Sequence, residues 1–126
     1  MFTIEVSKAR TIAATLIQSL RQSGGASINK DLKSPIDGYM VSFEGAEIVF
    51  NTNSDIDINC LTYAIQRTFS GIGDDLYFGI WKDQTNGKIY FDISENIKEK
   101  NSAIRIGRSR KQIAIYEVVS NCSIYL

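Results

Sequence analysis

The segment DLYFGIWKDQTNGKIYFDIS, residues 75–94, decides the fold. It contains two runs rich in aromatic and β-branched residues, DLYFGIW (75–81) and KIYFDIS (88–94). The pair Asn86-Gly87 lies between them and favours a tight turn. Apolar and polar residues alternate along both runs, so the segment predicts an antiparallel β-hairpin with one buried face.

The two faces of this hairpin differ in chemistry. Phe78 and Phe91 fall on the apolar face, and we expect both in the core. Trp81, Tyr90 and Asp92 fall on the opposite face. That face either packs under a helix or a partner chain, or it presents a ring on which a base stacks, which is worth about 1–3 kcal/mol. Asp92 would accept hydrogen bonds from a ribose or pair with an arginine.

Periodicity places the remaining elements around this hairpin. We expect three helices and further strands at these positions: helices over 6–22, 55–69 and 101–111, and strands over 38–43, 46–50 and 112–118, with 123–126 as a candidate last strand. Gly24 would end the first helix, and Gly71 and Gly73 the second. Glu44-Gly45 would join two strands as another hairpin. We therefore expect one α+β domain over 1–126, an antiparallel sheet of β-hairpins with about three helices packed largely on one face.

Composition excludes several functional classes. The chain of 126 residues carries 14 Lys plus Arg against 14 Asp plus Glu, which argues against general nucleic-acid binding. It has no histidine, which removes Ser-His-Asp triads and most catalytic zinc sites. We therefore expect a binding protein and not an enzyme, with no cofactor and no metal.

The sequence also bears on the compartment. No apolar run is long enough to span a membrane, and the N-terminal residues lack the order of a signal peptide. We expect a cytoplasmic protein, with Cys60 and Cys122 reduced and buried as small apolar residues.

A cationic run, RIGRSRK, precedes the strand predicted over 112–118. Arg105, Arg108 and Lys111 are spaced three residues apart, so they share one face of the predicted helix. The planar fork of arginine binds phosphate through two hydrogen bonds. The alternative is a solvated helix face with ion pairs to Glu95 or Glu99.

A longer pattern carries a family resemblance. It consists of three pieces: Gly79-x-Trp81-x-Asp83-x-x-x-Gly87-Lys88-x-Tyr90-x-Asp92-x-Ser94, Ala103-x-x-x-Gly107-Arg108, and Gln112-x-Ala114-Ile115-Tyr116. This pattern resembles the first-described type of Thoeris anti-defence proteins, which are small phage and prophage proteins. Proteins of that type sequester the cyclic ADP-ribose signal of a bacterial immune enzyme and do not cleave it.

The resemblance implies a ligand and a set of contacts. The ligand would be a cyclic ADP-ribose isomer, held in pockets at the subunit interface of an even-numbered homo-oligomer, a dimer or higher. The family's arginine corresponds to Arg108, its aromatic residue falls near Trp81, and its polar strand residue falls near Asp92. The family carries an amide at this last place, and an ionised carboxylate cannot donate as an amide does. With the neighbouring Arg105, Lys111 and Tyr90, these residues form the predicted binding set.

Two other functions stay open from the residues alone. The same aromatic and arginine side chains would suit a phage or prophage inhibitor that binds a host defence protein or nuclease directly. A nuclease or nucleotide hydrolase without histidine would need paired carboxylates, Lys or Tyr, and no acid–base pair at suitable spacing is evident.

Overall fold

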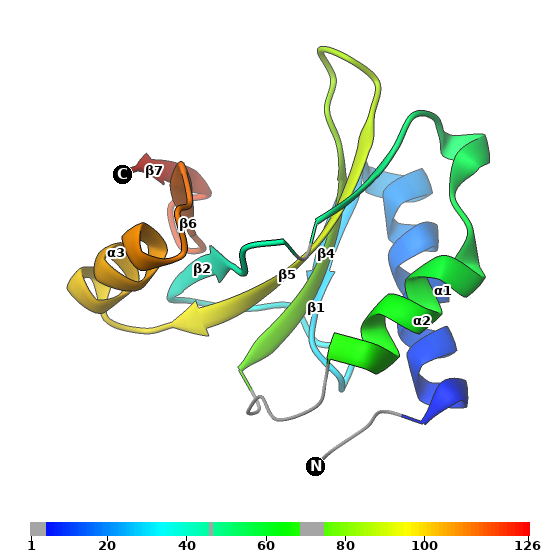
Figure 1. The fold of residues 1–126 in the computed structure, drawn as a ribbon, viewed down its shortest axis with the longest axis horizontal. Helices are drawn as coiled ribbons and strands as arrows, with labels where there is room; N and C mark the ends of the chain where they lie inside the picture. The colour runs from blue at the N-terminus through cyan, green and yellow to red at the C-terminus, as the bar shows by residue number, and fades with distance from the viewer. Residues whose placement is uncertain (1–4, 46, 69–74) are drawn as a thin grey trace.

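The computed structural model of the chain describes residues 5–45, 47–68 and 75–126 (Figure 1). These residues form three α-helices: α1 (Val6–Ser23), α2 (Ile58–Thr68) and α3 (Lys100–Ser109). They also form seven strands: β1 (Gly25–Ile28), β2 (Tyr39–Ser42), β3 (Ile48–Phe50), β4 (Leu76–Lys82), β5 (Ile89–Ile97), β6 (Ala114–Glu117) and β7 (Cys122–Tyr125). The expected α+β fold with an antiparallel sheet and three helices is confirmed.

All strand pairs are antiparallel, and the sheet runs in the order β1-β4-β5-β2-β6-β7. The long strand β5 organises it. β4 pairs along one side of β5, as the sequence predicts for the hairpin. Along its other side, β5 pairs first with β3, through Phe91 and Ile48, and then with β2, through Ser94 and Ser42. β5 therefore contacts both halves of the sheet.

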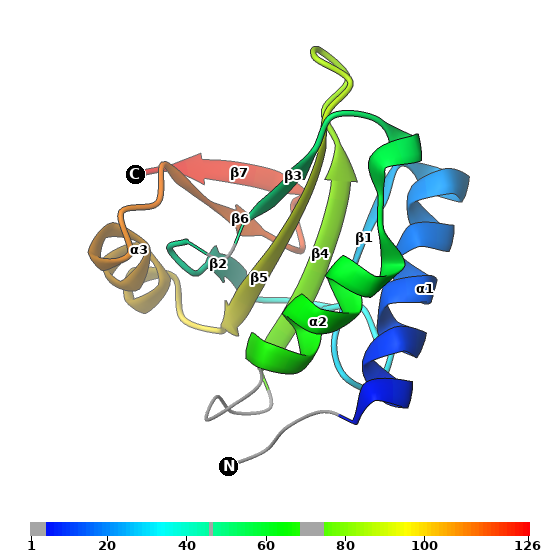
Figure 2. The same cartoon turned by 45° about the vertical axis from the view of Figure 1, so that its right-hand side comes forward.

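The three helices cover one face of the sheet. α1 and α2 pack over β1, β4 and β5 on a large core that includes the fully buried Phe78 and Phe91. α3 packs over β2 and β6 on a smaller core of Val41, Ala103 and Ile115. In Figures 1 and 2, α3 lies at the opposite end of the sheet from α1 and α2. The other face of the sheet carries no helix of the described residues.

Two expectations about the strands were wrong. No strand was expected over the segment that forms β1, but it pairs along β4. β2 and β3 were expected to form a hairpin with each other, but in the described residues both pair with β5 instead. Gly45 does adopt a left-handed conformation, with φ +78°, but β2 and β3 run in the same direction and follow one another along one side of β5. The glycines expected to end the second helix lie outside the described residues.

Helix α1 ends as expected, at Gly24 in the left-handed conformation with φ +86°. The prediction that the cysteines are buried was wrong, because Cys60 and Cys122 are both exposed, although both are free thiols. None of the helices in the described ranges combines the length and the apolar character needed to cross a bilayer.

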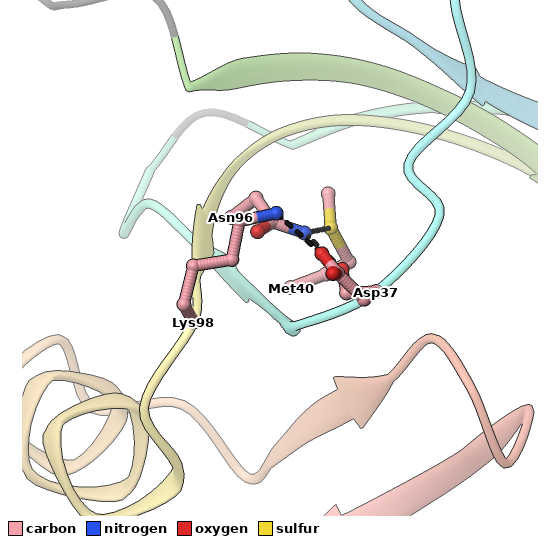
Figure 3. A network of polar contacts seen from close by, with 4 residues as sticks. All are labelled: Asp37, Met40, Asn96 and Lys98. Atoms are coloured by element: carbon pink, nitrogen blue, oxygen red, sulfur yellow. Dashed lines mark hydrogen bonds and ion pairs between the residues drawn. The ribbon is translucent and has the colours of Figure 1, made fainter.

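A polar network fixes the start of β2 (Figure 3). The Asn96 amide donates to the Asp37 carbonyl oxygen at 2.7 Å and to the Met40 sulfur at 3.2 Å. Gly38 has φ +81°, and a Cβ there would lie 2.5 Å from Asn96 Oδ1. Lys98 forms an ion pair with Asp37 on the outside. This network holds the turn that aligns β2 with β5.

Candidate ligand-binding site

The uncovered face of the sheet contains a concavity of about 650 Å³. One side is formed by β1, β4 and β5, and the other by β2, β6 and β7. Its polar and aromatic lining includes Ser27, Ser42, Trp81, Asp92, Tyr116 and Ser123. The volume falls within the range of about 300–1,000 Å³ that is usual for small-molecule sites.

An aromatic pair forms one wall of the concavity. Trp81 and Tyr90 are cross-strand partners, and their rings stack with centroids 4.5 Å apart and planes 16° apart. Tyr90 does not itself line the concavity, so it supports Trp81 from behind. On the other side, Trp81 pairs with Gly25 of β1, which has no side chain to cover the ring. Trp81 is 44% exposed, which is high for a tryptophan held in a sheet.

Asp92 lies in the concavity in a half-buried position. The Ser42 hydroxyl donates to Asp92 Oδ2 at 2.9 Å and lies 3.1 Å from the Ser94 hydroxyl. Burial raises the pKa of the Asp92 carboxyl above its usual value, the Ser42 hydrogen bond opposes this, and the charge of Glu47 adds to it. In the described residues no arginine or lysine pairs with Asp92, so the ion pair considered from the sequence is not formed.

The glycine at position 79 leaves room above this carboxylate. Gly79 is the cross-strand partner of Asp92, and a Cβ at Gly79 would lie only 2.8 Å from Asp92 Oδ1. Any other residue would therefore displace the carboxylate or fill the concavity. The wall at Trp81 and the floor at Asp92 are both kept open by glycines on neighbouring strands.

The predicted cations lie elsewhere in the chain. Arg105 and Arg108 are exposed on α3, and Lys111 is exposed just after it. α3 packs through Ala103 and Gly107 on the helix-covered face. None of the three cations lines the concavity. The structure therefore brings Trp81, Tyr90 and Asp92 together, and a single chain does not place the cations beside them.

Arg110 of the cationic run has a structural position. Its guanidinium forms an ion pair with Glu95 at 2.6 Å, donates to the Val41 carbonyl oxygen at 3.3 Å and lies 4.0 Å from the centre of the Phe43 ring. Hydrogen bonding from Ser102 lowers the pKa of Glu99, and the charge of Arg105 contributes. Arg110 thus follows the alternative of an ion pair with Glu95, and Lys111 lies 4.0 Å from Glu44, while the described residues leave the Arg108 guanidinium without a hydrogen bond or ion pair.

Sequence reasoning missed several lining residues. Ser42 and Ser94 alternate with core residues on their strands, so their strand periodicity was a signal that they face the same side as Asp92. Strand periodicity could not identify Ser27, because the strand β1 that carries it was not predicted. Tyr116 and Ser123 reach the concavity only through the β2–β6–β7 pairing.

A second hollow of about 390 Å³ lies between β3 and α2, lined by residues that include Glu47, Cys60, Tyr63 and Arg67. It is smaller, and its cation is engaged with Tyr63, since the Arg67 guanidinium lies 5.2 Å from the ring centre. In the described part of the chain, no group of three carboxylates or cysteines is arranged to hold a metal ion. The concavity on the uncovered face is therefore the better candidate site.

Neither family models, nor curated proteins, nor solved structures give a match to this chain.

Proposed function

We propose that the protein binds and sequesters a cyclic ADP-ribose immune signal without cleaving it, as a phage anti-defence protein in the cytoplasm of an infected bacterium. The observation that carries the proposal is the stacked Trp81–Tyr90 pair beside the Asp92 carboxylate, in a concavity on the face that no described helix covers. The pattern that resembles Thoeris anti-defence proteins runs through the same two strands. An aromatic wall and a polar floor suit the base and the sugars of a nucleotide.

In this proposal the adenine stacks on the Trp81 ring. One face of that ring is occupied by Tyr90, and the side toward Gly25 has no side chain over it. Stacking of a base on an aromatic ring is worth about 1–3 kcal/mol. The support from Tyr90 holds the indole in place before the ligand arrives, which lowers the entropy cost of binding.

The pyrophosphate of the ligand needs cationic donors, and no Lys or Arg of the described residues lines the concavity. We therefore assign Arg108, assisted by Arg105 and Lys111, to the phosphates of a ligand bound mainly by a second copy of the chain. A symmetric dimer or a higher even-numbered homo-oligomer would present α3 of one copy to the concavity of another. The site would then be complete only in the oligomer.

Absence of turnover is part of the proposal. Hydrolysis of a glycosidic bond ordinarily uses two carboxylates, one as the acid and one as the base or nucleophile. Of the described residues that line the concavity, Asp92 is the single carboxylate, and it is hydrogen-bonded to Ser42. The chain also lacks histidine, the commonest general base near neutral pH.

Ligand retention tests the proposal. The purified protein is incubated with cyclic ADP-ribose isomers, separated from free ligand and heated, and the released nucleotide is identified by mass spectrometry. We expect intact ligand from the natural protein, and at least tenfold less from Trp81→Ala because the stacking surface is lost. Tyr63→Ala, which removes an exposed ring outside the concavity, is the matched control and should retain ligand. Cleaved ligand, or equal retention by Trp81→Ala, would contradict the proposal.

Mixed oligomers test the role of Arg108. Arg108→Ala alone should also lose retention, while remaining folded because its side chain is exposed. In a symmetric dimer, a refolded equal mixture of Trp81→Ala and Arg108→Ala chains would regain about one quarter of the sites, since the mixed dimer contains one intact site. No recovery on mixing would mean either that Arg108 and Trp81 of the same chain form one site, or that one of the two residues does not contribute to a site.

A direct protein inhibitor is the second candidate, favoured by one observation. Ile113, Val119 and Tyr125, which lie in or beside the β6–β7 strand pair, are 75–80% exposed, and exposed large apolar side chains are a feature of protein interaction surfaces. Such a surface suits a host defence protein or nuclease. Recovery of one partner protein in equal amount from a bacterial lysate, with no nucleotide retained, would favour this candidate.

A further inference from the structure

The hydrogen-bonding direction in the floor of the concavity restricts which part of a ligand can lie there. The floor is the cluster of Ser42, Asp92 and Ser94. A serine hydroxyl carries one proton. Ser42 gives its proton to Asp92 Oδ2, so the 3.1 Å contact between the two serines requires Ser94 to donate to Ser42. Both hydroxyl protons of the floor are therefore used inside it.

The groups that remain are acceptors. In the described residues nothing donates to Asp92 Oδ1, and the absence of a side chain at Gly79 leaves the space above that oxygen open. Ser94 Oγ keeps its lone pairs, and Ser94 lines the same concavity. A ligand group in the floor must therefore bring hydrogen-bond donors. A phosphate group, which only accepts and carries negative charge, is unfavourable beside this carboxylate.

From this donor–acceptor arrangement we infer that the floor selects the vicinal diol of a ribose, with Asp92 as the specificity-determining residue, and that it orients the ligand with this diol inward and its phosphates toward the rim. The inference rests on the proposed function for the identity of the ligand. A diol supplies two O–H donors on adjacent carbons, one for Asp92 Oδ1 and one for Ser94 Oγ. A carboxylate that binds ribose hydroxyls is an established solution in dinucleotide-binding proteins.

The orientation agrees with the rest of the site. The diol of a nucleoside lies on the sugar that carries the base, so a base stacked on Trp81 places its ribose toward the middle of the concavity. The phosphates then point out of the concavity, where the proposed function brings Arg108 from a second copy. Asp92 thus orients the ligand, with its sugar toward the floor and its phosphates toward the rim.

Nucleoside probes test this inference, and Trp81 reports on them because it is the single tryptophan of the chain. Adenosine should quench its fluorescence, and inosine should bind with similar affinity because it keeps both hydroxyls and differs only in the base, where a carbonyl and an N1–H replace the exocyclic amine and the bare N1. 2′-Deoxyadenosine and 3′-deoxyadenosine should each bind at least about tenfold more weakly, because each leaves one acceptor of the floor unpaired. Adenosine 5′-monophosphate should bind no more than a few-fold differently from adenosine.

The matched variants are Asp92→Asn and Asp55→Asn. The amide of Asp92→Asn would keep its oxygen on Ser42 and present a donor to the ligand, so the preference for adenosine over 2′-deoxyadenosine should fall below about threefold. Asp55 is exposed in the short 3₁₀ helix Asn53–Asp55, and its substitution should leave the preference unchanged.

The outcomes separate this inference from the proposed function. Retention of cyclic ADP-ribose by a protein that binds adenosine and the deoxynucleosides equally would overturn the inference and leave the function standing. A preference for the diol without retention of cyclic ADP-ribose would overturn the proposed function and leave the inference standing. Loss of binding with inosine, or no quenching by adenosine up to millimolar concentration, would also overturn the inference.

Discussion

The two faces of the β4–β5 hairpin have the same backbone and opposite roles. On the helix-covered face, Phe78 and Phe91 are fully buried. On the uncovered face, Trp81 lies three residues from Phe78 on β4, Asp92 lies next to Phe91 on β5, and both line a concavity. The first face is explained by burial of apolar surface. The second face has a tryptophan that is 44% exposed to solvent and a carboxylate that is partly buried, and neither arrangement stabilises a free chain.

This difference separates residues that stabilise the fold from residues that the proposed function assigns to binding. Residues on the covered face should matter for unfolding and residues on the uncovered face for ligand retention. The cationic run shows the same division on a smaller scale, since Arg110 is paired with Glu95 and Arg108 extends into solvent. The predictions below separate the two groups.

The largest expected effect is on the covered face. Phe78→Ala should lower the free energy of unfolding by about 3–5 kcal/mol, because it leaves a cavity in the main core. Trp81→Ala, on the same strand, should change it by less than about 1 kcal/mol. Urea unfolding followed by circular dichroism measures both. Similar losses for the two variants would mean that the uncovered face is also a structural surface.

A smaller effect separates the two arginines. Arg110→Ala should destabilise the protein by about 1–3 kcal/mol, because it leaves the partly buried Glu95 without its partner and removes the contact with Phe43. Arg108→Ala should change stability by no more than about 0.5 kcal/mol. Thermal unfolding at fixed salt compares them. A larger loss for Arg108→Ala would show that its side chain supports the fold.

The smallest effect has the opposite sign. Burial raises the folded-state pKa of Asp92 above its unfolded value, so the folded protein binds the proton more tightly than the unfolded chain. Ionisation of Asp92 therefore destabilises the fold, fully above the folded pKa and not at all below the unfolded one. Asp92→Asn should be more stable by about 0.5–2 kcal/mol at neutral pH, and the gain should vanish as pH falls below the unfolded value.

Unfolding free energies across this pH range, with Asp55→Asn as the control, test the prediction. Glu47 is the charged neighbour that adds to the shift, so Glu47→Gln should reduce the gain. A variant Asp92→Asn that is less stable at neutral pH would show that the carboxylate stabilises the fold, and the separation between the two faces would be lost.

Sequence alone predicted the elements that are determined by residues close together in the chain. The alternation in 75–94 defines both faces of the central hairpin, and Gly24 ends α1 because its left-handed conformation suits glycine. The strand β1 was missed because its residues, GASI, have weak strand preference, and pairing with β4 is what orders them. The hairpin between β2 and β3 was mispredicted because Glu44-Gly45 was taken to reverse the chain, whereas β2 and β3 run in the same direction and pair one after the other with β5.

The same limit applies to the candidate site. Trp81, Tyr90 and Asp92 were found because they share one face of one hairpin. Ser42 reaches the site only because β2 pairs with β5, and the sequence did not predict this pairing. Within the cationic run, spacing does not reveal that Arg110 reaches Glu95. Local periodicity thus identifies the face, and only the long-range pairing identifies the concavity.

The small core beneath α3 has a consequence for how quickly the proposed ligand would dissociate. Among the described residues its fully enclosed apolar side chains are Val41, Ala103 and Ile115, with partly buried apolar residues around them. Segments that bury less apolar surface open at lower free energy than the whole protein. Tyr116 and Ser123, which form the far wall, belong to this segment. We expect the segment that carries α3, β6 and β7 to open locally while the wall at Trp81 stays folded. The residence time of the ligand would then depend on the rate of this opening, and substitutions that stabilise the segment would lengthen it.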